Sequence, residues 1–587
     1  MGWLSPLVAS ALPLCAQQPA EAVRLNQVGF YPAAPKVAVV VGASAGKFYL
    51  TTLDRGTPVF TGVLGAAHYD SLARQPTRTA DFSGCQRVGT FVLSVPGVGV
   101  SAPFQIRPRV HEAVAQAALK GFYYQRTATA LPPAYAGPWS RPAGHPDQQV
   151  LVHASAASPQ RPAGTVLASP RGWYDAGDYN KYVVNSGITM GTLFSLYEDF
   201  PAYCTQLNAH IPESTNALPD VLDEALWNLR WLLTMQDPTD GGVYHKLTNA
   251  SFDGMVMPAA CTTPRYVVQK STAAALDFAA VLAQASRVLR GFDRQVPGLA
   301  DSCLRAATQA WGWARLHPAV YYDQSANNLR FQPAILTGEY GDHDVADEWQ
   351  WAAAELYATT RQDAYYQAVP LLAKGPAPLP AWSQVRTLAY YTLARCQQQL
   401  TPLGQQNAPQ VRQQLLALAD GLLAGYPATA YHTVMGLTAA DYTWGSNATA
   451  ANQGIALVQA YRLTNDRRYL LAALTNLDYL LGRNATGYCF VTGVGTHSPQ
   501  HPHHRLSEAD GVAAPVPGLL VGGPNPGRQD KCAYPSALAP RAYSDSVCSY
   551  ASNEIAINWN APLVYLAAAI EACQASAGLV PARPSKQ

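Results

Sequence analysis

The sequence is poor in charged residues: Asp, Glu, Lys and Arg make up 13% of its 587 residues, about half of the usual ~25%. Forty Lys and Arg against 38 Asp and Glu leave a net charge of +2, without a basic stripe of the kind that follows a phosphate backbone. Nucleic acid and anionic membranes are therefore not expected as partners. The remaining composition is polar and aromatic, with 32 Tyr and 12 Trp, and suits a neutral, hydroxyl-rich ligand.

Other features that would define a function are also missing. No stretch offers ~18 uninterrupted apolar residues, so no membrane span is expected. No cysteine pair has the close spacing of a zinc cluster, and no phosphate-binding loop, dinucleotide fingerprint or serine-nucleophile elbow is present. Of the ten cysteines, Cys532 and Cys548 lie close together in a loop-like region and could form a disulfide.

The first part of the chain divides into two segments. Met1–Ala16 is a short apolar stretch closed by small residues, the outline of a secretory signal peptide. Residues 1–22 are therefore predicted to be a signal peptide and the protein to be secreted or periplasmic. Residues 23–107 contain short β-branched and aromatic runs about ten residues apart, which predict a small sandwich of immunoglobulin size.

Residues 108–578 are predicted to be helical. Eleven or twelve amphipathic or buried helical stretches recur without a convincing strand between them, which favours an all-α toroid over a βα barrel. One of these helices is expected to begin at Pro562, since proline suits the first position of a helix. Two long loops, 127–172 and 485–552, interrupt the helices, and such loops usually carry function. Residues 579–587 are interpreted as a tail.

Asp175 and Asp178 form the first candidate site. They stand three residues apart, with Gly177 between them, and this spacing can aim two carboxylates at one water molecule. One carboxylate would orient the water while the other removes its proton. The alternative is an Asp-rich turn that caps the following helix, and the spacing alone favours that alternative. Two carboxylates are too few for a calcium site.

Glu554 is the second candidate. Ile555, Ile557 and Trp559 follow it, and the helix expected at Pro562 begins shortly afterwards. A carboxyl group among apolar side chains keeps its proton to higher pH, as a general acid requires. The alternative is a surface glutamate near a helix start, favoured there by the helix dipole.

A histidine-rich stretch is the third candidate. His497, His501, His503 and His504 precede Arg505. A metal site is disfavoured because neither cysteine nor a helical pair of histidines accompanies them. Two alternatives remain: the histidines donate hydrogen bonds to sugar hydroxyls, or they belong to a loop without a functional role. Together the three candidates supply the carboxyl groups that inverting glycoside hydrolysis needs, an acid and a base ~6.5–9.5 Å apart.

At these residues the sequence resembles glycoside hydrolase family 9, the endoglucanase family with an (α/α)6 barrel. Residues 24–30 resemble the opening of the immunoglobulin-like module that precedes many of its catalytic domains. Residues 172–187 resemble its aspartate segment, residues 491–505 its histidine signature and residues 543–561 its acid-bearing signature. The resemblance implies a β-sandwich at 23–107 followed by an (α/α)6-barrel catalytic domain at 108–578.

The resemblance also implies a role for each matching residue. Asp178 matches the general base, Asp175 the residue that helps to hold the nucleophilic water, and Glu554 the general acid. The implied mechanism is a single displacement with inversion at the anomeric carbon and no organic cofactor. Further residues of the same motifs are expected to belong to the site, with Asp545 and His503 in the catalytic group and Arg505, Trp173 and Tyr543 as substrate-binding residues.

The resemblance raises two questions about metals. Relatives with the N-terminal module often carry zinc on cysteines, but here Thr127 and Gly144 stand at those positions, so no zinc is predicted. Residues 338–348 resemble a segment that binds structural calcium in some relatives. Asp347 and Glu348 would be its side-chain ligands. The alternative is simple charge complementarity at the start of the next helix.

The predicted function is therefore a secreted, monomeric endo-β-1,4-glucanase that acts on cellulose or soluble β-glucans. Within the same enzyme class the alternatives are an exo-acting cellodextrinase or β-glucosidase, and a xyloglucan or mixed-linkage glucanase. A non-catalytic glycan-binding protein is the alternative from another class. The combination of Asp175, Asp178 and Glu554 argues against it, because a binder needs neither a base nor an acid.

Overall fold

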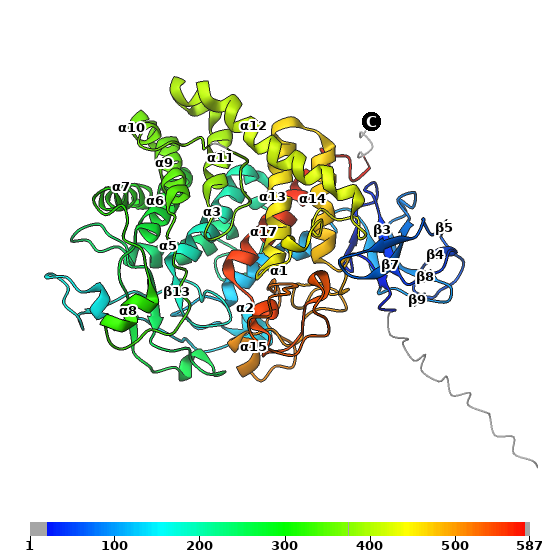
Figure 1. The fold of residues 1–587 in the computed structure, drawn as a ribbon, viewed down its shortest axis with the longest axis horizontal. Coiled ribbons are helices and arrows are strands. Elements are labelled where there is room, and N and C mark those ends of the chain that lie inside the picture. The colour runs from blue at the N-terminus through cyan, green and yellow to red at the C-terminus, as the bar shows by residue number, and fades with distance from the viewer. Residues whose placement is uncertain (1–19, 374, 582–587) are drawn as a thin grey trace, which may run out of the picture.

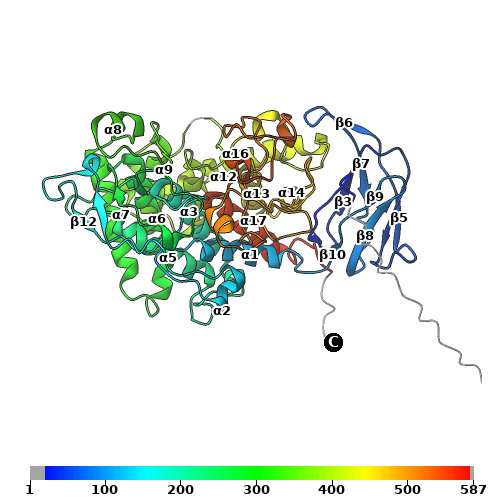
Figure 2. The ribbon, with the colours of Figure 1, turned by 90° about the horizontal axis from the view of Figure 1, so that it is seen from below.

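The computed structural model describes residues 20–373 and 375–581. Most of the predicted signal peptide (1–22) and of the predicted tail (579–587) lies outside the described residues. A β-sandwich stands beside a larger helical body, and many loops of that body gather at one end of its long helices together with α2 (Pro133–Ala136), α8 (Gln324–Arg330) and α15 (Arg505–Ala509) (Figures 1 and 2). The predicted order of an immunoglobulin-like sandwich followed by a helical barrel is confirmed.

The sandwich consists of two sheets whose alternate side chains meet in one core. Phe91, Leu93 and Val95 point inward from one long strand and share a buried core with Ala38 and Val40 of the other sheet, because successive residues of a strand face opposite sides of the sheet. The first sheet has the order β1 (Val23–Arg24), β3 (Val37–Val41), β7 (Gln75–Asp81) and β6 (His68–Asp70). The second has the order β2 (Gly29–Phe30), β10 (Phe104–Ile106), β8 (Gly89–Val95), β4 (Lys47–Thr51) and β5 (Phe60–Val63), and β9 (Gly99–Val100) pairs with β8.

The helical body alternates between two kinds of helix. In the described part of the chain, six helices are buried on most sides, as expected for an inner ring. They are α3 (Val183–Asp199), α6 (Thr272–Leu289), α9 (Ala346–Thr360), α11 (Arg386–Arg395), α13 (Ser446–Thr464) and α17 (Ile557–Cys573). Each follows a more exposed partner: α1 (Glu112–Tyr124), α5 (Asp220–Thr234), α7 (Leu299–Leu316), α10 (Asp363–Gln367), α12 (Pro402–Gly425) or α14 (Arg467–Leu480). This alternation builds the (α/α)6 barrel.

A small sheet interrupts the helices, so the prediction that no strand separates them is wrong. Its order is β12 (Val166–Leu167), β11 (Val150–Val152), β15 (Arg265–Val267), β14 (Lys246–Asn249) and β13 (Lys181–Tyr182). These strands are two to four residues long, too short for an alternating pattern to identify them. Two of them, β11 and β12, lie within the long loop predicted at 127–172.

The last barrel helix begins earlier than predicted. α17 starts at Ile557, and Pro562 lies inside it rather than at its first position. The proline removes one internal hydrogen bond. The backbone before the helix is extended because Ala556 pairs with Ala176 in an antiparallel bridge. This pairing, rather than the proline, sets where the helix begins.

The opening segment of the sandwich, residues 24–30, holds the two domains together. Arg24 Nη1 donates a hydrogen bond to the Thr486 carbonyl oxygen at 2.8 Å, and Asn26 Nδ2 donates to Asp478 Oδ1 at 2.7 Å. Gln27 Oε1 accepts hydrogen bonds from the backbone N–H groups of Thr496 and His497 at 2.9 and 2.8 Å. The sandwich therefore fixes the beginning of the histidine-rich loop.

Two further sequence expectations can be compared with the structure. Cys532 and Cys548 form a disulfide, as predicted. Among the described residues, one helical stretch, Thr272–Phe292, is long and apolar enough to span a membrane, but 94% of it is buried inside the protein. This stretch belongs to α6 and forms part of the barrel core.

Candidate active site

Backbone pairing brings the three sequence motifs together at one end of the barrel. Ile557 N–H donates a hydrogen bond to the Asp175 carbonyl oxygen at 2.8 Å, next to the bridge between Ala176 and Ala556. His503 pairs in parallel with Glu554, and its N–H donates to the Asn553 carbonyl oxygen at 2.9 Å. The aspartate segment therefore lies against the acid-bearing segment, which in turn lies against the histidine-rich loop.

Gly177 allows this close approach. A Cβ atom at this position would lie 2.0 Å from the His503 carbonyl oxygen, so any other residue would separate the two segments. The Gly177 carbonyl oxygen accepts hydrogen bonds from the backbone N–H and from Nη1 of Arg505, at 3.1 and 2.9 Å. Arg505 thus fixes the turn that lies between the two aspartates.

Asp175 is buried, and both of its carboxylate oxygens accept hydrogen bonds. Asn185 Nδ2 donates to Oδ1 at 2.6 Å, and the Tyr340 hydroxyl donates to Oδ2 at 2.8 Å. Burial and the nearby Asp178 raise the pKa of Asp175 to about 8, although the two hydrogen bonds act in the opposite direction. The donors hold the carboxyl group in one orientation.

Asp178 is held on one side only. Its Oδ2 accepts hydrogen bonds from Asn180 Nδ2 at 2.5 Å and from the Tyr182 hydroxyl at 3.1 Å. Its Oδ1 is buried and has no hydrogen-bond partner among the described residues. An oriented carboxylate with one free oxygen is the geometry that accepting a proton from water requires.

Glu554 is mostly buried between these groups. Burial, followed by the charges of Asp178 and Asp175, raises its pKa well above the usual range, while Arg505 lowers it. Two carboxylates near a third disfavour its ionisation. The proton of Glu554 is therefore held more strongly than that of a surface glutamate at a helix start, as a general acid requires.

Asp545 organises the loops next to Glu554. Its two oxygens accept hydrogen bonds from the backbone N–H groups of Gln500 and His501 at 2.8 and 2.9 Å, and Oδ1 also accepts one from Asn553 Nδ2 at 3.1 Å. Asn553 immediately precedes Glu554. Asp545 thus connects the histidine-rich loop with the acid-bearing segment and is placed to position the acid.

His503 and Arg505 lie beside the carboxyl groups, and their roles in catalysis and substrate binding stay predictions. His503 Nδ1 is 2.6 Å from the Val547 carbonyl oxygen, so its Nδ1–H is the donor. Burial lowers the pKa of His503, which favours the neutral ring. Arg505 Nε donates to the Asp253 carbonyl oxygen at 2.8 Å, and the guanidinium group lies 5.5 Å from the ring centre of Phe252.

Two residues predicted to bind substrate are instead buried. Trp173 is 1% exposed, its indole N–H donates to Glu224 Oε2 at 3.3 Å, and its ring packs on Phe122. Tyr543 is 3% exposed, and its hydroxyl donates to Asn553 Oδ1 at 2.6 Å. Neither ring offers a face to a sugar, so the structure contradicts both predictions of direct contact. Both residues instead support the motifs through these buried contacts.

Tyr340 is the main site residue that sequence reasoning missed. Its hydroxyl reaches Asp175 from the segment 338–348, which the sequence linked only to calcium. The ring packs edge-on against Tyr182 at 4.9 Å and Trp382 at 5.2 Å between ring centres. Its backbone has a left-handed φ of 50°. An isolated tyrosine in a loop gives no local signal of such a contact.

A second group of carboxyl groups surrounds the start of α9. Asp277, Asp347 and Glu348 are buried, and Asp342 is partly exposed. Both oxygens of Asp277 and both of Glu348 receive no hydrogen bond from a described residue. Burial and Asp277 raise the pKa of Glu348 to about 11. Unsatisfied, mutually repelling oxygens fit a calcium ion, and Asp277 on α6 is a candidate ligand that the sequence did not indicate.

The site combines a carboxylate that has a free oxygen, a neighbouring carboxyl group held by two donors and a third carboxyl group whose pKa is raised, which is the equipment of a glycoside hydrolase. Comparison with known sequences agrees. Residues 111–567 match Glycosyl hydrolase family 9, and residues 18–100 match the cellulase N-terminal ig-like domain. The chain therefore belongs to glycosyl hydrolase family 9, among the endo-β-1,4-glucanases.

Relatives match nearly the whole chain. It is 47% identical to the xyloglucan-specific endo-beta-1,4-glucanase of Bacteroides ovatus, over 97% of both chains. It is 35% identical to endoglucanase D of Acetivibrio thermocellus, over 92% of this chain and 82% of the relative. A solved structure of a Bacteroides ovatus family 9 protein matches with a TM-score of 0.90 and 46% identity, covering 94% of this chain and 99% of that one.

Proposed function

We propose that the protein is an endo-β-1,4-glucanase that inverts the anomeric configuration. Asp178 Oδ1 would take the proton of a water molecule while Asp175 holds that water. Glu554 would protonate the departing glycosidic oxygen. The observation that carries this proposal is the contrast at the site, where Asp178 presents a free oxygen and the pKa of Glu554 is raised far above its usual range.

We further propose that the glucan is xyloglucan. The support is the 47% identity, over 97% of both chains, to an enzyme named as xyloglucan-specific. Unbranched β-glucans are the comparison substrates, because a relative at 35% identity is named only as an endoglucanase. A binding site for xyloglucan must accommodate side-chain sugars, so it must hold the glucan backbone without enclosing it. Unbranched β-glucans do not impose this requirement, which separates the two substrate classes.

A substrate panel with analysis of product length tests both proposals. Xyloglucan, mixed-linkage β-glucan, carboxymethyl cellulose and cellohexaose would be digested side by side, and early products separated by size. We expect the fastest cleavage of xyloglucan, with long fragments appearing first. Release of only glucose or cellobiose would indicate exo action, and binding without cleavage would indicate a glycan-binding protein.

Two accompanying features complete the proposal. The protein acts outside the cytoplasm, as the apolar N-terminal stretch and the Cys532–Cys548 disulfide suggest, because disulfides persist in oxidising compartments.

A calcium ion is held by Asp277, Asp347 and Glu348, whose buried oxygens would otherwise repel one another. Its role is structural, since it would fix the segment that carries Tyr340.

A further inference from the structure

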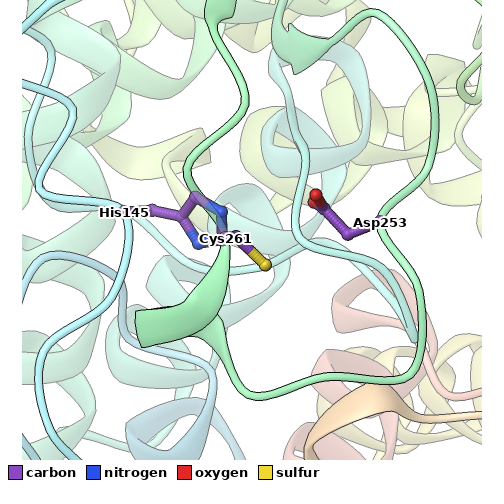
Figure 3. A group of neighbouring side chains, drawn as sticks. All are labelled: His145, Asp253 and Cys261. Atoms are coloured by element: carbon purple, nitrogen blue, oxygen red, sulfur yellow. The ribbon is translucent and has the colours of Figure 1, made fainter.

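Three potential metal ligands meet beside the active site on two loops. His145 lies in the loop that precedes β11, whereas Asp253 and Cys261 lie in the loop between β14 and β15. One ligand atom from each residue lies within 4.8 Å of the others. Figure 3 shows the imidazole, the thiol and the carboxylate facing a common space. None of the three residues takes part in the proposed hydrolysis.

His145 is prepared to act as a ligand. Its Nδ1 lies 2.9 Å from the Tyr174 hydroxyl oxygen, while Nε2 is buried and has no hydrogen-bond partner among the described residues. The residue is 5% exposed. The metal-binding tautomer would donate Nδ1–H to the Tyr174 hydroxyl and keep the Nε2 lone pair for the ion, as metal-binding histidines are usually arranged.

Cys261 and Asp253 supply the negative charge. The Cys261 Sγ atom lies within 4.8 Å of a carboxylate oxygen of Asp253, and a cysteine thiol that binds no metal ion carries its proton at neutral pH. A bound metal ion displaces that proton, because the thiolate is the ligand. Both side chains are partly exposed, which gives an ion a route into the site.

We propose that His145 Nε2, Cys261 Sγ and the Asp253 carboxylate bind one zinc ion, with water as the fourth ligand. Mixed nitrogen, sulfur and oxygen ligands suit zinc, which takes three protein ligands in an open tetrahedral site. Zinc bonds of ~2.0–2.3 Å place neighbouring ligand atoms about 3.5 Å apart, so the loops must close slightly around the ion.

The charges of the surroundings permit this ion. One thiolate and one carboxylate neutralise Zn²⁺, so the loaded site adds no net charge to a region that contains Lys181 and Arg265. Both of these cations are already paired with Asp147, at 2.7 and 3.1 Å. One carboxylate balances only one of these two cations, so it matters that the loaded site is neutral and adds no further positive charge.

The ligand set differs from the cysteine pair whose absence predicted no zinc. At Gly144, an added Cβ atom would lie 2.3 Å from Pro258 Cβ. The loop that carries Asp253 and Cys261 thus occupies the space beside Gly144. The prediction of no zinc considered only Thr127 and Gly144, and the ligands of this site come together only in the folded chain.

The ion would tie this loop to the catalytic segment. The Asp253 carbonyl oxygen accepts a hydrogen bond from Arg505 Nε at 2.8 Å, and the Val256 carbonyl oxygen accepts one from the Tyr179 hydroxyl at 2.7 Å. Tyr179 directly follows Asp178. A zinc ion that joins Cys261 and Asp253 to His145 would therefore hold the loop against the residues that position the base.

Metal analysis of the full-length protein tests the proposal. Protein without a polyhistidine tag would be dialysed, and bound zinc measured by mass spectrometry. We expect about one zinc ion per chain, and its loss in Cys261→Ser and His145→Ala. In the cobalt-substituted protein, absorption from thiolate-to-cobalt charge transfer should also disappear in Cys261→Ser. Cys85→Ala, which removes a thiol of the sandwich core, is the matched control and should keep both signals.

Circular dichroism would show that each variant is folded, so that a loss of metal reports the site. If His145→Ala does not fold, Cys261→Ser alone decides. The proposal is overturned if wild-type protein offered equimolar zinc retains none, or if Cys261→Ser retains as much zinc as Cys85→Ala. Because these measurements do not depend on hydrolysis, they remain interpretable if the proposed function fails.

Discussion

The protein buries two clusters of carboxyl groups, and the two clusters differ in the hydrogen bonds that their oxygens accept. In the catalytic group, Asp175 and Asp178 accept hydrogen bonds from neutral Asn and Tyr side chains. In the group at the start of α9, Asp277 and Glu348 receive none from the described residues. Both groups contain like charges in a buried environment, where ionisation is costly.

The difference indicates two solutions to the same electrostatic problem. Neutral donors fix the orientation of a carboxyl group and leave it free to gain or lose a proton, as catalysis requires. Carboxyl oxygens without donors would instead be stabilised by the proposed calcium ion, which would fix their charge and remove them from proton transfer. The first group is suited to chemistry and the second to structure.

The largest expected effect comes from removing the proton-transfer groups. Glu554→Gln and Asp178→Asn should each lower kcat by about 10²–10⁴-fold, the usual contribution of a general acid or base. Each change keeps the shape of the side chain, so Tm should change little. Steady-state kinetics on xyloglucan would measure the loss. Glu508→Gln, an exposed glutamate in the same region, is the matched control, and equal activity in all three variants would refute the assignment.

The second-largest effect is expected from the α9 group, the carboxyl groups of Asp277, Asp342, Asp347 and Glu348 at the start of α9. A calcium ion at 100 times its dissociation constant stabilises the folded state by ~2.7 kcal/mol, so chelation with EGTA should lower Tm by several degrees. Asp277→Asn should abolish this dependence because it removes a ligand and a buried charge. Scanning calorimetry would measure both, with the exposed Asp301→Asn as the control. A wild-type Tm that is unchanged by EGTA would exclude a calcium ion here.

A smaller effect is expected at the edge of the catalytic group. Tyr340→Phe removes one donor from Asp175 and should lower kcat by about tenfold, the equivalent of one strong hydrogen bond, with little change in KM. Because that hydrogen bond lowers the pKa of Asp175, its loss should raise this pKa. The defect should therefore be greater at about pH 6 than at about pH 8. A uniform loss at all pH values would contradict this role.

Much of this organisation could be predicted from the sequence, because the motifs carry Asp175, Asp178 and Glu554 in local patterns. Contacts across long chain separations could not. Tyr340 lies 165 residues from Asp175, and Asp277 reaches the α9 group from another helix. The short strands of the third sheet are stabilised by pairing between distant segments rather than by local preference. Trp173 shows a further limit, since membership of a motif does not reveal which way a side chain points.

The smallest effect on catalysis is expected at Trp173. Trp173→Phe removes the hydrogen bond to Glu224 and leaves a small cavity, which should destabilise the fold by about 1–3 kcal/mol. KM for xyloglucan should stay within about twofold of wild type, because no uniform binding interaction is lost. Thermal denaturation and kinetics would separate the two effects. A large rise in KM without a change in Tm would restore the predicted contact with substrate.

The central claim is that Asp178 activates a water molecule while Glu554 protonates the leaving oxygen in a single displacement. The most direct test is a proton NMR time course of the hydrolysis of a β-1,4-linked oligosaccharide, followed from the first turnovers. A single displacement predicts that the α-anomer of the new reducing end appears first and then mutarotates. Initial appearance of the β-anomer would show retention and contradict the assignment of base and acid.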